Sequence, residues 1–367
     1  MKRKTILLIF AALCIAVGVA LSGLALHMAG FGWNGAGNPF TDPGNQGALA
    51  RFFGNELKER KTYDFAPEEI NWLIFTDTDE KVTVLPSADV LAHVSYYEGA
   101  GEYYGISNAG GRLEIVKHSD RRWYQNFGFH WNTQDTSVTI EIPAEKAFAG
   151  GAEITTSNGE IGYTGVSISG PLLLKTSNAR ITAGGFEAAS GLDAMSSNGE
   201  IALRRIGGGA WRLTARTSNA GIALEGLGGW DGITAQTTNG SVGASSVAAG
   251  SVDLATSSAR VTLDGVTARS LSLTTSNGEV NANAVAAENV DLTTSNARIA
   301  LGGVAVTQSL SLTTSNGSIT GTINGKKEDF GITSVTSNAR NNLTDNPGGK
   351  IQLDVRTSNG DIDLNFR

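Results

Sequence analysis

The sequence predicts an all-β protein: a single-chain β-solenoid (β-helix) of about 20 residues per coil, preceded by an irregular β N-terminal part and one transmembrane helix. Three observations support this prediction. A phrase related to Thr-Ser-Asn recurs eleven times after residue 150, apolar residues alternate around each copy with the period of a β-strand, and the chain opens with a long apolar run. A repeat made of two or three short strands cannot bury its inner face alone, so successive copies must stack around one continuous core.

The start of the chain predicts a membrane anchor. A basic tail, residues 1–5, precedes 21 uncharged and mostly apolar residues from Ile6 to Leu26, a length that crosses a bilayer as a helix. Because basic residues stay on the cytoplasmic side, we expect residues 6–29 to form a single-pass signal anchor, with the N-terminus cytoplasmic and the C-terminal domain extracellular. The alternative is a cleaved signal peptide, whose apolar core is usually shorter; Gly18-Val19-Ala20 comes nearest to a cleavage site.

Composition argues against several classes of function. The formal net charge of -7 provides no basic face for phosphate, so we expect no nucleic-acid partner. Cys14 is the only cysteine, which rules out an intramolecular disulfide and a cysteine metal cluster. His130 is the last histidine, so the repeats after it contain none for a catalytic triad or zinc site. Acidic residues such as Asp253, Asp264 and Asp291 are scattered, which makes a carbohydrate-active enzyme the weakest interpretation. We expect no catalytic, metal-binding or cofactor-binding residues.

Two regions separate the anchor from the regular repeats. Residues 30–62 form a Gly/Asn/Pro-rich linker, in which an apolar spacing around Phe52 and Phe53 allows a juxtamembrane helix that lies on the bilayer or packs against the domain. Residues 63–150 alternate as strands without a clean repeat. We expect them to form the irregular β N-terminal part and to protect the open end of the solenoid.

Aromatic residues gather between Arg121 and Trp131. They could form a platform on which a sugar or lipid stacks, or they could pack as core and cap, and the packing interpretation is favoured. This candidate ligand surface consists of Trp123, Tyr124, Phe127, Phe129 and Trp131.

One polar position defines the regular solenoid repeats of residues 151–367. It is occupied by Asn158, Asn178, Asn198, Asn219, Asn239, Ser258, Asn277, Asn296, Asn316, Asn338 and Asn359. We predict a corner between two strands, because Asn and the Gly beside it tolerate left-handed backbone. Stacked Asn side chains would hydrogen-bond along the solenoid as a ladder, weakened at Ser258.

The two residues after this position alternate along the chain. The first of these residues is Gly and Ala in strict alternation. The second is an acidic residue or Ser after each Gly, and it is Arg after each Ala except for one Ala that is followed by Gly. A coil of about 20 residues places opposite charges on neighbouring coils, whereas one of about 40 would stack like charges, so we favour the short coil. The charge ladder consists of Glu160, Arg180, Glu200, Arg260, Glu279, Arg298, Arg340 and Asp361.

The pattern loosens toward the C-terminus. Charged residues 326–329 interrupt it, and Asn341 stands where an apolar residue is expected. Two interpretations are open: protection of an exposed end against edge-to-edge association, which is favoured, and a binding loop.

Four segments carry a family resemblance by their order. They are EEINWLIFTDTDEKVTVLPSADVLAHV, YYGISNAGGRLEIV, SVTIEIPA and the first TTSNGEI. Residues 64–367 resemble the bacterial "putative adhesin" family of β-strand-repeat domains of unknown function, which includes Lia-type envelope-stress proteins. The resemblance implies a membrane-tethered β-solenoid at the surface of a Gram-positive-type bacterium, with roles in envelope stress, adhesion or antimicrobial-peptide response. It implies no catalytic residues.

These observations together predict a membrane-anchored extracellular β-solenoid that acts as a non-catalytic, adhesin-like binding scaffold at the bacterial cell envelope. Its expected partners, besides the membrane, are cell-wall polymer, a peptide or an envelope protein. The alternative is an envelope-stress sensor or regulator that acts through a membrane partner.

Overall fold

The computed structural model describes residues 58–367 except 68–69, 100, 121–133, 144–145 and 147. The predicted membrane span, the apolar stretch of the linker and the aromatic cluster of residues 121–131 lie outside the described residues. No helix within the described ranges combines the length and apolar character that a membrane span requires.

The chain groups into two compact units. Among the described residues, the smaller includes residues 58–61 and parts of 97–104 and 117–136. Within it, Lys58 Nζ lies 2.9 Å from Glu102 Oε2, and the rings of Tyr103 and His118 stack with their centroids 5.2 Å apart.

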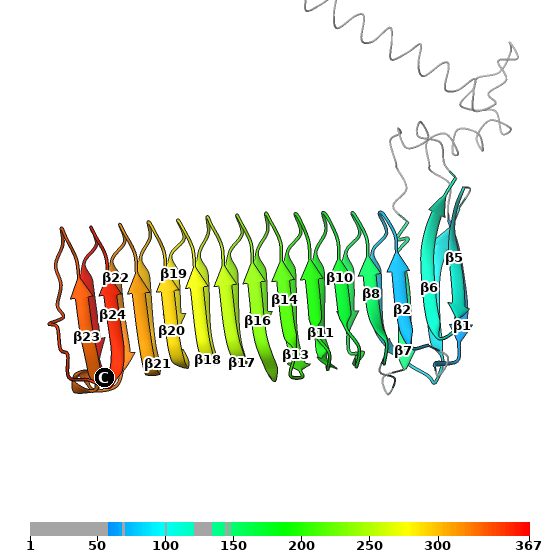
Figure 1. The fold of residues 1–367 in the computed structure, drawn as a ribbon. Coiled ribbons are helices and arrows are strands. Elements are labelled where there is room, and N and C mark those ends of the chain that lie inside the picture. The colour runs from blue at the N-terminus through cyan, green and yellow to red at the C-terminus, as the bar shows by residue number, and fades with distance from the viewer. Residues whose placement is uncertain (1–57, 68–69, 100, 121–133, 144–145, 147) are drawn as a thin grey trace, which may run out of the picture. The chain divides into compact units, whose positions relative to one another are not determined.

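The larger unit, Thr62–Tyr96, Gly105–Val116 and Ser137–Arg367, is a β-solenoid whose coils stack side by side (Figure 1). Neighbouring coils pair as parallel strands in register: Ile161 faces Ile181, and Ile181 faces Ile201. Each coil therefore advances the chain by about 20 residues, which confirms the short coil.

Each coil has one strand before its Asn corner and one after it. The strands before a corner are β8 (Gly151–Thr155), β10 (Leu172–Lys175), β12 (Leu192–Met195), β14 (Arg212–Arg216), β16 (Trp230–Gln236), β20 (Ala286–Thr293), β23 (Phe330–Val335) and β24 (Ile351–Arg356). The strands after a corner are β9 (Ile161–Thr164), β11 (Ile181–Ala188), β13 (Ile201–Gly208), β15 (Ile222–Glu225), β19 (Val280–Asn283), β22 (Ile319–Asn324) and β25 (Ile362–Phe366). Three strands run without a break from one corner to the next: β17 (Val242–Ala255), β18 (Val261–Thr274) and β21 (Ile299–Thr313).

The N-terminal part adds seven strands. They are β1 (Glu59–Phe65), β2 (Trp72–Thr76), β3 (Val82–Ser87), β4 (Ala92–Glu98), β5 (Glu102–Ala109), β6 (Arg112–Ser119) and β7 (Val138–Pro143). A short 3₁₀ turn, η3 (Lys327–Asp329), precedes β23.

The core fills the inside of the coils. Alternate residues of each strand point inward, so columns such as Ile161, Ile181 and Ile201 are at most 1% exposed. Burying one such side chain stabilises the fold by about 1.5–3 kcal/mol. Tyr163 and Phe186 meet edge-on in this core, with ring centroids 4.9 Å apart.

The two ends of the stack do not follow chain order. At the N-terminal end β2 lies between β6 and β8, so Leu73 faces Leu113 on one side and Ala152 on the other. At the C-terminal end β24 lies between β21 and β23, so Leu353 faces Leu310 and Ile332. The strand β24 is thus paired on both sides and has no free edge.

The last coil in the stack is partly covered by its own chain. Ile332 and Asn346 exchange two main-chain hydrogen bonds as an antiparallel bridge, and the Asp345 carboxylate accepts from the Ser334 amide at 2.9 Å. Asn341 faces Ile362 through a single parallel bridge.

The prediction of left-handed Asn corners is wrong. In the described residues no Asn has a positive φ; a column of left-handed residues lies instead seven positions after the Asn column. They are Gly165, Gly185, Arg205, Gly226, Ser246, Gly265, Ala284 and Gly303, with φ between 48° and 80°. At the Asn column the main chain is hydrogen-bonded to the preceding coil: the amides of Ser177 and Asn178 both donate to the main-chain oxygen of Ser157, at 3.1 and 2.9 Å.

Candidate functional site

The Asn column forms a ladder of amide hydrogen bonds. The Asn178 amide donates to Asn158 Oδ1 at 2.7 Å, and Asn198 donates to Asn178 at 2.6 Å. Further bonds of 2.6–2.8 Å join Asn158 to Asp79, Asn219 to Asn198, Asn239 to Asn219, Asn296 to Asn277, Asn316 to Asn296, Asn359 to Asn316 and Asn338 to Asn359. The order of the last two steps reflects the inserted C-terminal coil.

The ladder is interrupted at Ser258. The Ser258 hydroxyl lies 3.4 Å from Asn239 Oδ1, and the Asn277 amide reaches only the main-chain oxygen of Ser257, at 3.5 Å. Ser is too short to bridge both neighbours, so this corner lacks a link that most of the others have.

A second ladder of buried hydroxyl groups lies two residues before each Asn. Thr237 donates to the main-chain oxygen of Ala220 at 2.9 Å, and Thr256 donates to that of Gly240 at 2.8 Å. This column was not predicted from the sequence, although an unbroken column of Thr or Ser was the available signal. Its buried members are Thr156, Thr176, Ser196, Thr217, Thr237, Thr256, Thr275, Thr294, Thr314 and Thr357.

The same hydroxyl groups explain why Gly follows the corner residue in every second coil. In coils whose corner residue is followed by Gly, here called Gly coils, the hydroxyl also accepts a hydrogen bond from the main-chain N–H of that Gly. Gly278 N, for example, lies 3.1 Å from Thr275 Oγ1. This holds the Gly so close to the preceding coil that a Cβ on Gly278 would overlap the main-chain oxygen of Ala259. The Gly of every second coil is therefore a steric requirement of the corner, in addition to any electrostatic one.

The charge ladder joins coils at the solenoid surface. Arg180 lies 2.8 Å from Glu200, and Arg260 lies 3.0 Å from Glu279. Arg298 also contacts Glu279, and its hydrogen bond, aided by Arg260, lowers the pKa of the Glu279 carboxyl. All these side chains are partly exposed, so each pair stabilises the fold by only about 1 kcal/mol or less.

The other members of the charge ladder have different partners. Glu160 lies 3.8 Å from Lys81 on the N-terminal side. Arg340 pairs with Asp361 at 2.8 Å because the C-terminal coil is inserted beside it, and this contact lowers the pKa of Asp361.

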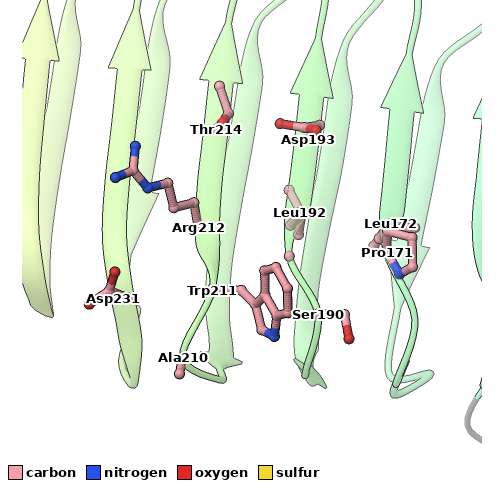
Figure 2. A pocket seen from close by; sticks show the side chains of 11 residues that line it. Pro171, Leu172, Ser190, Leu192, Asp193, Ala210, Trp211, Arg212, Thr214 and Asp231 are labelled. Carbon is pink, nitrogen blue, oxygen red and sulfur yellow. The ribbon is translucent and has the colours of Figure 1, made fainter.

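A shallow depression of about 440 Å³ lies on the outer face of the coils around Trp211 (Figure 2). Trp211 stands eight residues before Asn219, where the two adjacent coils carry Ser190 and Asp231. Its side chain is 58% exposed. The depression is lined by Pro171, Leu172, Ser190, Gly191, Leu192, Asp193, Ala210, Trp211, Arg212, Thr214 and Asp231.

The polar groups of the depression come from neighbouring strands. In Figure 2 the indole of Trp211 lies toward the coil of Ser190 and Leu192, while Arg212 extends the other way, toward the coil of Asp231. Asp231 also lies 3.5 Å from Arg269. The result is one apolar ring among hydroxyl, carboxylate and guanidinium groups.

Titratable groups elsewhere meet mainly in pairs. His93 is an exception, because Asp64 lies 2.7 Å from its Nδ1 and Asp89 lies 2.9 Å from its Nε2. Over the ranges that the structure describes, no three His, Cys, Asp or Glu side chains are grouped so that they could hold a metal ion. Trp123, Tyr124, Phe127, Phe129 and Trp131, the sequence-based candidate ligand surface, lie outside the described residues.

The model of the Toastrack DUF4097 family matches residues 70–366. The chain belongs to the Toastrack family. The family match begins before the first Thr-Ser-Asn corner, at the coil of β2 and β3, so that coil is part of the Toastrack domain. The sequence-based recognition of a β-strand-repeat family of unknown function is confirmed.

Solved structures of low identity also resemble the chain. A putative lipid binding protein from Parabacteroides distasonis is 13% identical, covers 84% of this chain and 97% of its own, and superimposes with a TM-score of 0.31. A putative adhesin from Bacteroides fragilis is 13% identical, with 84% and 98% covered and a TM-score of 0.27. A putative cell adhesion protein from Clostridium sporogenes is 10% identical, with 85% and 100% covered and a TM-score of 0.19. No curated protein matches the chain.

Proposed function

We propose that this Toastrack chain is a non-catalytic binding scaffold of the bacterial cell envelope, held at the cell membrane by its N-terminal segment and presenting the solenoid outside. The observation that carries the proposal is Trp211, which is 58% exposed on the outer face of the coils and lies beside charged and hydroxyl side chains. Exposed aromatic side chains among polar groups are typical of binding surfaces, where Trp and Arg supply much of the affinity.

The construction of the solenoid supports a role in presenting binding side chains, not in catalysing a reaction. Main-chain pairing, the Asn ladder and the buried Thr ladder fix each coil to the next. The recurring polar residues of the corners are therefore used for structure, and the outward-facing side chains between corners are free to vary. A surface of this kind positions binding groups with little loss of conformational entropy on contact.

The membrane attachment is argued from the sequence. The apolar run from Ile6 to Leu26 follows three basic residues, which favours export of everything after it. A tethered solenoid would then meet cell-wall polymer, peptides and envelope proteins before it meets any cytoplasmic molecule.

The test uses the full-length protein in detergent, incubated separately with purified cell-wall polymer and with solubilised membranes of the source bacterium. Sedimentation with intact polymer, without release of soluble fragments, is the expected result. Stoichiometric capture of a signalling membrane protein instead would favour the sensor or regulator. Release of fragments would identify an enzyme, and retention by neither preparation would contradict a scaffold role.

A further inference from the structure

We propose that the depression around Trp211 binds a sugar ring of a neutral polysaccharide, with the indole stacked on the apolar face of the ring. This inference names the ligand class for the scaffold proposed above and rests on that proposal. Nothing in the sequence repeat requires an aromatic side chain at this position, because the adjacent coils carry Ser190 and Asp231 there.

A role in packing does not explain why the Trp211 side chain is exposed. The neighbouring Trp230 shows what a structural Trp does in this region: it is 2% exposed, and its indole N–H donates to the main-chain oxygen of Ile206 at 3.3 Å. Trp211 is 58% exposed and points along the outer face instead. The exposed part of the Trp211 ring gains none of the burial free energy that Trp230 gains, and that free energy is available to a ligand that covers the ring.

The charges around the ring favour a ligand without net charge. Arg212 and Asp193 contribute opposite charges to the lining, and the third charged residue of the lining, Asp231, is accompanied by Arg269. A cation drawn to a carboxylate of the lining would be repelled by the guanidinium of Arg212, and an anion drawn to Arg212 would be repelled by the two carboxylates. A neutral ligand with many hydroxyl groups avoids both conflicts.

The remaining lining groups suit a sugar. Carboxylates accept hydrogen bonds, the guanidinium donates them, and the Thr214 hydroxyl can do both. The Ser190 hydroxyl already donates to the main-chain oxygen of Ser169 and can accept from a ligand. Figure 2 shows these groups on both sides of the indole, spread over strands of neighbouring coils. The volume of about 440 Å³ falls within the range of small-ligand sites. A polysaccharide segment could therefore lie across the coils with one ring on Trp211 and its hydroxyl groups on the flanking strands.

Calorimetric titration of the full-length protein with neutral hexasaccharides tests this site. The probes are hexasaccharides of β-1,4-linked glucose, mannose and N-acetylglucosamine, titrated into wild type, Trp211→Ala, Trp211→Phe and Arg212→Ala. We expect saturable binding of at least one probe, weakened about tenfold or more in Trp211→Ala and less in Trp211→Phe. Tyr63→Ala is the control, because Tyr63 is another exposed aromatic residue, at 50%, outside the depression. The Tyr63→Ala variant should bind the hexasaccharides with the same affinity as wild type.

The outcomes separate this inference from the scaffold proposal. If wild type binds none of the probes, or if Trp211→Ala binds as tightly as wild type, the sugar site is overturned. Trp211→Ala that still sediments with cell-wall polymer would leave the scaffold role standing with a different contact surface. Weaker binding in Trp211→Ala and Arg212→Ala, with a smaller loss in Trp211→Phe and unchanged thermal unfolding in Trp211→Ala, would support the site.

Discussion

At the scale of single residues, the Gly that follows each second Asn is the most sharply constrained position of the corner. Gly278→Ala places a methyl group against the main-chain oxygen of Ala259. We expect it to lower the free energy of unfolding by about 1–3 kcal/mol or more, as other overpacking changes do. The matched control is Ala297→Gly on the next coil, which should cost about 1 kcal/mol or less. Urea unfolding of both variants checks this, and equal losses would contradict the steric explanation.

His93 is the residue whose charge links pH to the stability of the N-terminal part. Hydrogen bonds to Asp64 and then Asp89 raise its pKa above the ordinary value of 6.5. A raised pKa means that the contribution of His93 is fully present below about pH 6.5 and disappears as the pH rises through the folded-state pKa. We therefore expect His93→Gln to be destabilised relative to wild type at about pH 6 and to differ little at about pH 9. Denaturant unfolding at both pH values measures this; a difference that is the same at both would contradict it.

At the scale of the corner, the gap in the Asn ladder offers a repair. Ser258→Asn would supply a donor for Asn239 and an acceptor for Asn277, the two bonds that the shorter Ser does not complete. Because the ladder is exposed, we expect a gain of about 0.5–1 kcal/mol in the free energy of unfolding. Ser258→Asp is the control, since a carboxylate can accept from Asn277 but cannot donate to Asn239, and it should gain less. Ser258→Asn no more stable than Ser258→Asp would show that the ladder bond is not the cause.

The same scale shows what the sequence could and could not predict. The apolar columns and the coil length follow from periodicity, because a one-residue slip would turn Ile181 or Ile201 out of the core. The left-handed corner was placed wrongly because its true column mixes Gly165 and Gly185 with Arg205 and Ala284, which hides the glycine signal. Trp211 was not predicted for a different reason. It is a single aromatic residue at one position of one coil, and a feature that occurs once gives no periodic signal in the sequence. Only the structure shows that its ring is exposed.

At the scale of the whole solenoid, the order of coils at each end could not be read from the repeat. Any coil whose columns match can pair with any other, since the contacts between coils are main-chain bonds and identical column positions. The C-terminal coil uses this freedom to lie between β21 and β23. There Gly360 stacks on Gly317, and the coil of Ala339 stacks on the other side of Gly360. The rule at the corner is therefore local: a Gly coil can follow either kind of coil.

This local rule predicts which internal deletions the solenoid tolerates. Deleting residues 259–296 removes two coils and sets Ala297 after the Gly240 coil, as Ala259 is set in the intact chain. Deleting residues 278–296 removes one coil and sets Ala297 where Gly278 stood, with its methyl group against Ala259. Although it removes fewer contacts, the one-coil deletion should therefore be the less stable and less cooperative of the two in urea unfolding followed by circular dichroism. Adding Ala297→Gly to the one-coil deletion should restore cooperative unfolding, because it removes the methyl group that overlaps Ala259. Arg298 would still stand where Glu279 stood, beside Arg260, so the rescued variant should remain less stable than the two-coil deletion. A one-coil deletion that unfolds as cooperatively as the two-coil deletion, or that Ala297→Gly does not improve, would show that the two-coil unit has a basis other than this steric contact.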